Sequence, residues 1–413
     1  MATARLAIAM AEAGFEVSAL CPPAHPLRKA NTVSRAYSYQ GLTPLKSFTR
    51  AIEASKPVLV IPGDDLATCH LHELHRKTKQ QAHGSAVCAL IERSIGSPAS
   101  YRLVGERATF IQIAQDEGIR APRTAVISTD ADLRRWISRT GLPVVLKANG
   151  SSGGDGVRIA DTAEGAHRAF HKLQAPPLLA RAAKRSLIDH DHSLMAPSLL
   201  RRGRVVNAQE FIDGREATSA VACWNGKVLA GLHFEVLEKI SSLGHATVLR
   251  RIDHPEMSAA VAKIAQRLNL SGLYGFDFML AAATGDAYLV EINPRTTQVG
   301  HLSMGEGRDL PAALFAAVNG QPSRPSARVI ENDTVALFPQ EWIRDAASPY
   351  LRSAYHDVPV QSPELVEACL RKARKQTGRE QPPMPATFVP AKYRPSSENL
   401  EPLMAREIGS RYE

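Results

Sequence analysis

The chain has 413 residues, of which 44% are hydrophobic, and a formal net charge of +9. This is the composition of a globular protein of about two to three domains, and no apolar run approaches the ~20 residues that span a bilayer. Five scattered cysteines without metal-site spacing indicate reduced thiols and a cytoplasmic location. Because basic residues are dispersed and aromatic residues make up only 6%, the charge favours small anionic substrates over nucleic acid.

Residues 1–104 have an α/β pattern without an evident opening strand. Residues 3–13 predict a helix that Gly14 ends, and residues 15–20 predict the strand that follows. Residues 57–61 form a short apolar run typical of a buried parallel strand. A domain of this class normally opens with a strand. Either that strand is absent or the chain as given begins late, so we expect an open sheet edge beside residues 15–20.

From residue 105 the pattern is that of α+β units. Thr129 with Asp132 predicts a capping box at the start of one helix. The predicted helices are 105–118, 130–140 and 161–173, and the predicted strands are 122–127 and the two that flank a glycine-rich loop at 147–157. Residues 176–203 are basic and irregular, and their role is left open.

Strands dominate from residue 205. Asn225-Gly226 is a strong hairpin turn, and Asp309 with Pro311 begins a helix that Gly320 ends. The strands are predicted at 205–212, 217–223 and 227–238, before a helix at 255–269. Residues 321–413 differ in composition, with a strand near 334–338, a helix capped by Ser362-Pro363, a basic run at 371–379 and a proline-rich tail.

The stretch 272–301 is predicted to form a β-hairpin with one apolar and one polar face. Successive side chains of a strand point to opposite faces. One face is therefore expected to hold Phe276, Phe278 and Leu280 on the first strand and Tyr288, Val290 and Ile292 on the second. The other face is expected to hold Asp277, Glu291 and Asn293.

The length of the turn decides whether the acidic side chains meet. A three-residue loop at 283–285, with Gly285 in the left-handed conformation, places Asp277 directly opposite Glu291. A two-residue loop sends Glu291 to the wrong face. Two carboxylates and the Asn293 amide oxygen suit Mg²⁺. An ordinary hairpin with a polar outer face remains the alternative unless a phosphate site lies elsewhere in the chain.

The loop KANGSSGGDGV, residues 147–157, is a candidate phosphate site. Its four glycines allow successive backbone N–H groups to form an anion-binding nest, and Lys147 supplies a positive charge. It matches neither a Walker loop nor a Rossmann turn, because the lysine precedes the glycines and a strand follows them. A flexible hairpin loop is the alternative.

A third candidate is QEFIDGRE, residues 209–216. A strand that breaks at Asp213-Gly214 exposes backbone groups that can bind the edge of an adenine, and Glu216 can accept hydrogen bonds from ribose hydroxyls. Taken alone, the segment is a strand and a turn.

In this order the three pieces resemble the ATP-grasp superfamily, over residues 105–320. The resemblance implies two α+β subdomains that grip ATP, with the glycine-rich loop in a lid subdomain at about 122–204. Residues 1–104 resemble the Rossmann-like pre-ATP-grasp domain, and 321–413 would be a small C-terminal region. The loop is similar to the lid loop of biotin carboxylases. EINPRTTQVGH, residues 291–301, has the spacing of a motif of the carboxyaminoimidazole ribonucleotide synthetases.

The resemblance also implies roles for individual residues. The metal ligands, for Mg²⁺ or Mn²⁺, would be Asp277, Glu291 and Asn293, and Arg295 would be the catalytic arginine that faces the reacting acyl phosphate. Gln209 lies at a hinge position that often holds Glu, beside the Glu210 carbonyl and the Ile212 amide. The residues implied to bind ATP are Arg107, Lys147, Gly150, Ser151, Ser152, Gly153, Gly154, Gln209, Glu210, Ile212 and Glu216.

The implied activity is that of an ADP-forming carboxylate-amine ligase. A substrate carboxylate attacks the γ-phosphate of ATP, and an amine, or less favourably a thiol, displaces phosphate from the acyl phosphate. An ATP-grasp kinase and a non-catalytic ATP-binding regulator are the alternatives, and the presence of all three metal ligands and Arg295 argues against the regulator. Gly300 follows Gln298-Val299 where biotin carboxylases have a glutamate base, which argues against bicarbonate activation by that route.

The sequence names neither the carboxylate nor the amine, and it leaves the oligomeric state open. No nucleic-acid or membrane partner is expected. The polar residues that can line the substrate pocket are His233, Glu235, Glu238, Arg250 and Arg251, although each is equally consistent with a solvent-facing position.

Overall fold

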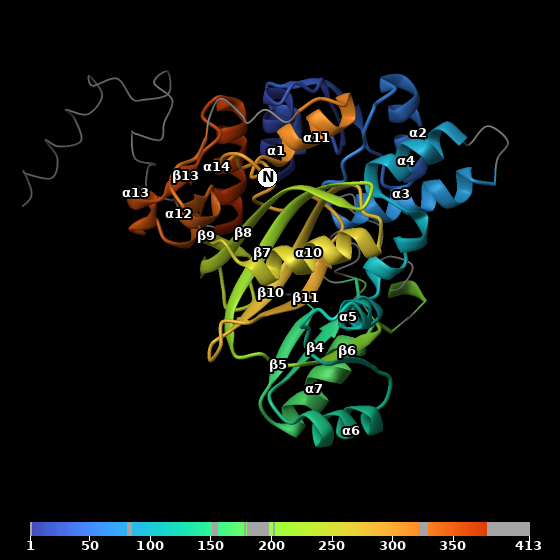
Figure 1. Cartoon of the computed structure of the whole chain (residues 1–413), viewed down its shortest axis with the longest axis vertical. Helices are drawn as coiled ribbons and strands as arrows, with labels where there is room; N and C mark the ends of the chain where they lie inside the picture. The colour runs from blue at the N-terminus through green and yellow to red at the C-terminus, as the bar shows by residue number, and fades with distance from the viewer. Residues whose placement is uncertain are drawn as a thin grey trace, which may run out of the picture.

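The computed structural model describes residues 2–80, 85–150, 156–176, 179, 198–200, 203–322 and 329–377. Among these residues the strands form three sheets of two, four and seven strands (Figure 1). The predicted mixture of α/β and α+β organisation is thereby confirmed. None of the helices described is long and apolar enough to cross a membrane.

The N-terminal part is built on the two-stranded sheet. The predicted helix and strand are present as α1 (Ala2–Glu12) and β1 (Val17–Cys21), and β1 pairs in parallel with β2 (Val33–Ser38). Among the described residues, β1 pairs with no strand other than β2. The helices that follow are α2 (Pro44–Ser55), α3 (Asp65–Thr78) and α4 (Ser85–Ile95), with short 3-10 turns at Pro26–Lys29, Pro98–Ser100 and Leu103–Gly105.

The strand predicted at residues 57–61 is wrong. This segment joins no sheet, and Val58 is exposed rather than buried. Its backbone is held by a side chain instead, because the Val60 N–H donates to Ser94 Oγ at 2.9 Å. An apolar run becomes a parallel strand only where a neighbouring strand completes its hydrogen bonds, and that neighbour is lacking here.

The four-stranded sheet has the order β3-β6-β4-β5 and carries two helices on one face. The capping box predicted for α6 is present, since Thr129 and Asp132 bond reciprocally. Buried residues from α6 and α7, including Leu133 and Phe170, pack on the sheet. The elements are β3 (Thr124–Ile127), α6 (Asp130–Thr140), β4 (Val144–Ala148), β5 (Val157–Ala160), α7 (Ala163–Gln174) and β6 (Val206–Glu210).

The seven-stranded sheet has the order β11-β10-β7-β8-β9-β12-β13 and extends beyond residue 321. The predicted turn at Asn225-Gly226 joins β7 to β8, with both residues at positive φ. Its strands are β7 (Gly214–Trp224), β8 (Lys227–Lys239), β9 (Ala246–Arg251), β10 (Gly272–Ala281), β11 (Ala287–Asn293), β12 (Thr334–Leu337) and β13 (Tyr355–Asp357). The associated helices are α5 (Arg107–Asp116), α10 (Pro255–Arg267), α11 (Leu310–Asn319), α12 (Gln340–Arg344), α13 (Tyr350–Ser353) and α14 (Pro363–Thr377).

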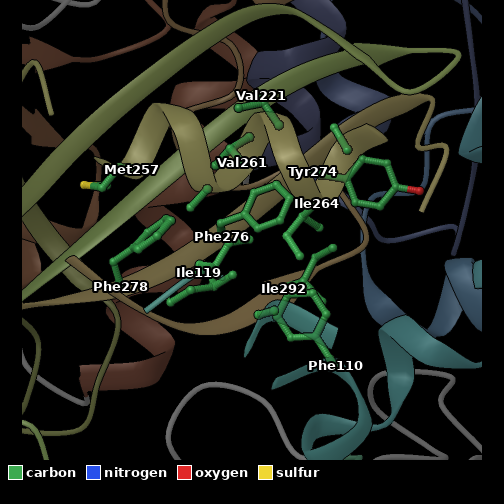
Figure 2. Close-up of a cluster of buried hydrophobic side chains, with 14 of the residues drawn as sticks. Phe110, Ile119, Val221, Met257, Val261, Ile264, Tyr274, Phe276, Phe278 and Ile292 are labelled. Atoms are coloured by element: carbon green, nitrogen blue, oxygen red, sulfur yellow. The ribbon is translucent and has the colours of Figure 1, made fainter. Parts of the chain in front are cut away.

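Both faces of the large sheet are packed. On one face Phe276 and Phe278 meet α10 residues such as Ile264, with Phe110 of α5 at the edge of the cluster (Figure 2). On the other face, residues of β7 and β8 pack against α1 and α11. Burial of both faces fixes the register of the strands, because a slip of one residue would move every side chain of a strand to the opposite face of the sheet.

The hairpin β10–β11 pairs Asp277 with Glu291, as predicted, but by a different route. Gly285 has a φ of +77°, yet the hydrogen bond from Ala281 N–H to Asp286 C=O closes a turn over 282–285, one residue longer than predicted. A β-bulge compensates for this extra residue. Phe278 faces Leu289 while the adjacent Asp277 faces Glu291, so Val290 is the inserted residue.

Because of the bulge, the apolar face predicted for β11 is partly wrong. Ile292 is buried as expected, but Tyr288 and Val290 are only partly buried. Their place in the core is taken by Ala287 and Leu289, because the bulge reverses the alternation on the turn side of Val290.

Candidate active site

The three predicted metal ligands lie together at the end of the β10–β11 hairpin. Asp277 faces Glu291 on one side and Thr218 of β7 on the other, so their side chains share a face of the sheet. Its carboxylate accepts from Thr218 Oγ1 at 3.0 Å and from Asn293 Nδ2 at 2.9 Å. Burial raises the pKa of Asp277, and the negative charge of Glu291 raises it further. Two carboxylates and an amide crowded in this way form a donor set of oxygens that fits a hard divalent cation.

Two predicted phosphate-binding cations face this acidic patch. Arg107, the first residue of α5, donates to Glu291 Oε1 at 3.0 Å and to the Ala148 carbonyl of β4 at 2.6 Å. It thereby joins the small sheet to the large one. Lys147 is 8% exposed, and burial lowers its pKa, although the nearby charges of Glu291 and Asp277 oppose that shift.

Hydrogen bonds hold the residues at the start of the glycine-rich loop. Gly150 has a φ of +68°, a conformation that favours glycine. Before it, the buried Asn207 of β6 donates to the Lys147 carbonyl at 3.3 Å and to Asn149 Oδ1 at 2.8 Å. The predicted residues Ser151, Ser152, Gly153 and Gly154 lie outside the described residues. Asn207 is a supporting residue that the sequence analysis missed.

The predicted adenine and ribose segment connects the two sheets. Gln209 is buried at the end of β6, and its side chain donates to Thr124 Oγ1 at 3.0 Å. The Glu210 carboxylate is engaged by Arg123 at 3.0 Å, which leaves only its backbone for the predicted adenine contact. Ile212 lies between β6 and β7.

Glu216, the predicted ribose ligand, lies on β7 and forms an ion pair of 2.6 Å with Lys239 of β8. Glu216 is also among the acidic groups whose charge acts on Lys147, so it belongs to the same site. The sequence did not indicate Lys239 as a partner of Glu216, because no motif marks its strand. Only the pairing of β7 with β8 brings it beside Glu216.

Arg295 is held between the hairpin and the N-terminal part. Its Nη2 donates to Asn293 Oδ1 at 3.2 Å, and its Nε donates to Asp65 Oδ1 at 3.0 Å. Asp65 is the first residue of α3, and Thr68 of the same helix donates to the Pro294 carbonyl at 2.8 Å. No sequence motif indicated that the first turn of this helix holds the arginine.

The residues considered for a substrate pocket do not gather at this site. Glu235 faces Ala217, the neighbour of Thr218, and therefore lies on the opposite face of the sheet from Asp277. It is 3% exposed and forms ion pairs with Arg215 and Arg250. The others are engaged as well: His233 bonds to Ser219 and Ser258, Glu238 pairs with Arg344, and Arg251 pairs with Asp253 and Asp333.

Comparisons with known proteins bear on the fold that carries this site. Residues 107–299 match the family model described as an ATP-grasp domain. N5-carboxyaminoimidazole ribonucleotide synthase of Vibrio parahaemolyticus is 24% identical over 219 residues, which are 52% of this chain and 52% of that protein. The chain thus spans about half the length of this relative.

Solved structures have the same fold at low identity. N5-carboxyaminoimidazole synthetase from Staphylococcus aureus, complexed with ADP, has a TM-score of 0.55 at 16% identity, over 79% of this chain and 77% of that one. Biotin carboxylase from Campylobacter jejuni has a TM-score of 0.55 at 14% identity, over 80% and 72%. The family model and these structures agree, and residues 107–299 therefore have the ATP-grasp fold.

Proposed function

We propose that this chain is an ATP-dependent ligase that activates a carboxylate as an acyl phosphate for attack by an amine. The observation that carries the proposal is the position of Arg295. Its guanidinium is held beside Asn293, on the same patch as Asp277 and Glu291. Arg107 of α5 contacts that patch through Glu291 and also donates to the Ala148 carbonyl of the small sheet. A nucleoside triphosphate bound between the two larger sheets would present its terminal phosphate at this patch. One relative named above is a ribonucleotide synthase, and one similar structure is a synthetase complexed with ADP, which supports the same chemistry.

Mg²⁺ is the cation that fits the hairpin, and Asp277, Glu291 and Asn293 would hold it. Their donors are all oxygens. Burial, and then the neighbouring charge of Glu291, raises the pKa of Asp277, and a bound cation would relieve both effects. When bound, the metal supplies charge neutralisation at the β- and γ-phosphates. Mn²⁺ has similar ligand preferences and is an alternative.

The protein residues would act mainly by position and charge. In the first step the substrate carboxylate oxygen bonds to the γ-phosphorus, and the bond to ADP breaks. Lys147, Arg107 and Arg295 offer fixed positive charge around the transferred phosphoryl group. In the second step the amine attacks the acyl carbon, phosphate leaves and the amine loses a proton. No protein nucleophile is required.

The contacts of Arg107 suggest one rearrangement. Arg107 forms its ion pair with Glu291, which is itself a proposed metal ligand. A metal-bound nucleotide offers Glu291 a cation and Arg107 a phosphate, so the two groups would exchange partners. The ion pair would hold both side chains near the site until the nucleotide arrives.

The test combines a phosphate-release screen over carboxylate and amine pairs with hydroxylamine to trap the acyl phosphate. A ligase releases phosphate and forms a hydroxamate, whereas a kinase releases no phosphate and a silent regulator turns over nothing. Either of the last two results would overturn the proposal.

Two variants then separate the roles. Glu291→Gln should weaken Mg²⁺-dependent nucleotide binding at least about tenfold, because a charged ligand is lost. Arg295→Ala should keep nucleotide binding and lose the chemical step. Asp286→Asn, in the same hairpin but paired with Arg120 at 3.5 Å, is the matched control. Near-normal activity of Glu291→Gln, or equal loss of binding and turnover in Arg295→Ala, would refute the respective role.

A further inference from the structure

A second group of metal-binding side chains lies on the two helices of the small sheet. Asp130 is the first residue of α6, and His167 and His171 are four residues apart on α7. The Nε2 atoms of the two histidines are 3.2 Å apart. Asp130 Oδ1 lies 3.2 Å from His167 Nε2 and 3.1 Å from His171 Nε2. Three donor atoms from two helices therefore converge on one point at the surface.

These separations are those of ligands around a small tetrahedral ion. With metal–nitrogen distances of about 2.0–2.1 Å and tetrahedral angles, two ligand atoms lie about 3.3 Å apart. Two imidazoles and a carboxylate are a ligand set that Zn²⁺ accepts, with water in the fourth position. A spacing of four residues also places both rings on one side of a helix, as such a site requires.

The backbone beneath the cluster is fixed independently of any metal. The capping box of Thr129 and Asp132 sets the first turn of α6, from which Asp130 projects. On α7, Phe170 is 1% exposed in the core of the small sheet, and the ring of His171 packs at 5.2 Å from it. Ligands held on rigid elements lose little freedom on binding, which favours affinity.

We propose that Asp130, His167 and His171 form a binding site for a tetrahedral transition-metal ion, most simply Zn²⁺, with water as the fourth ligand. It is distinct in chemistry from the hairpin site, which offers only oxygen ligands and suits Mg²⁺. It is distinct in place as well, because α6 and α7 lie at the end of the molecule below β4 and β6 (Figure 1). A metal there ties the start of α6 to α7 and stabilises the small sheet without taking part in the reaction.

The test is a titration of the untagged, metal-free chain with Co²⁺ in saturating Mg²⁺. Tetrahedral Co²⁺ absorbs visible light strongly, whereas Co²⁺ among oxygen ligands at the hairpin is octahedral and absorbs weakly. We expect one equivalent of tetrahedral Co²⁺ that Zn²⁺ displaces. His171→Gln and Asp130→Asn should each weaken this binding at least about tenfold, because one of three protein ligands is lost.

Two matched variants control for adsorption to surface side chains. Glu164→Gln changes an acidic residue of the same helix outside the cluster, and His245→Gln removes an exposed histidine before β9. Both should bind Co²⁺ as the wild type does. Equal Co²⁺ affinity in wild type and His171→Gln, or an octahedral spectrum in the wild type, would overturn the proposal. Because the readout is metal binding, its outcome is independent of whether the chain proves to be a ligase.

Discussion

At the scale of single residues, the position of Arg295 depends on Asp65. Their ion pair of 3.0 Å is the contact from α3 that orients the guanidinium. We expect Asp65→Asn to lower kcat about tenfold and to leave nucleotide affinity unchanged, since a charge-assisted hydrogen bond contributes about 1.5–3 kcal/mol. Steady-state kinetics with a substrate pair found by phosphate release measures kcat, and an equilibrium titration with ATP measures the nucleotide affinity.

The control for this variant lies on the same helix. Glu73→Gln removes a carboxylate whose ion pairs are with Arg76 and Lys77 on the surface. It should leave kcat as in the wild type. If Asp65→Asn and Glu73→Gln behave alike, Asp65 does not position Arg295.

Motifs in the sequence located the residues that bear charge at the site but not those that hold them. Asp277, Glu291 and Asn293 were predicted as a group, and the structure brings them together. Lys239 and Asp65 were missed, because each meets its partner only through tertiary packing. The roles assigned to the site residues remain proposals.

The alternation of side chains along a strand explains why the residues considered for a substrate pocket could not be placed from the sequence. His233 and Glu235 are two residues apart and so share a face, but the sequence does not say which face of a two-sided sheet that is. The pairing of Glu235 with Ala217 decides it, and that pairing depends on the whole sheet.

At the scale of elements, the bulge at Val290 compensates for the extra residue in the hairpin turn and so restores the pairing of Asp277 with Glu291. Leu289 is fully buried, whereas Val290 is only partly buried. We therefore expect Leu289→Ala to lower the free energy of unfolding by about 2–5 kcal/mol, and Val290→Ala by less than about 1 kcal/mol. Urea unfolding of the two neighbouring variants measures the difference. The register predicted from the sequence, without a bulge, requires the reverse order.

Elements with local signals were the easiest to predict. The capping box of α6 and the Asn225-Gly226 turn rest on residues adjacent in sequence, and both are present. The bulge has no such signal, because any residue type can occupy it. The failed strand at 57–61 shows the same limit, since a strand exists only with a partner.

At the scale of the whole molecule, ion pairs link parts that are distant in the sequence. Arg107 joins the two larger sheets, and Arg295 joins the hairpin to α3. A third link is buried: Arg5 of α1 pairs with Asp357 of β13 and also donates to the Phe338 carbonyl at 2.8 Å. His301, at the end of the motif that carries Arg295, lies 3.0 Å from the same carboxylate. The predicted divisions near residues 104 and 320 remain proposals, and these contacts cross both.

The buried carboxylate of Asp357 should contribute strongly to stability. Asp357→Asn leaves Arg5, which is 3% exposed, without its counter-charge. Removal of one partner from a buried ion pair costs about 3–5 kcal/mol, so we expect a loss of that size in urea unfolding at pH 7. Asp333→Asn is the control, because its partner is Arg251 at the surface and its loss should be below about 1 kcal/mol.

The same variant has a defined pH dependence. Burial alone would raise the pKa of Asp357, but the charges of Arg5 and His301 outweigh it and hold the pKa below its usual value. A carboxyl group with a lowered pKa stabilises the folded state fully above its unfolded pKa of about 3.9, and this contribution is lost as pH falls toward the folded pKa. The stability difference between wild type and Asp357→Asn should therefore shrink below about pH 4, relative to its value at pH 5. A difference that grows between pH 5 and pH 3 would mean that the charges of Arg5 and His301 do not outweigh the burial of this carboxylate.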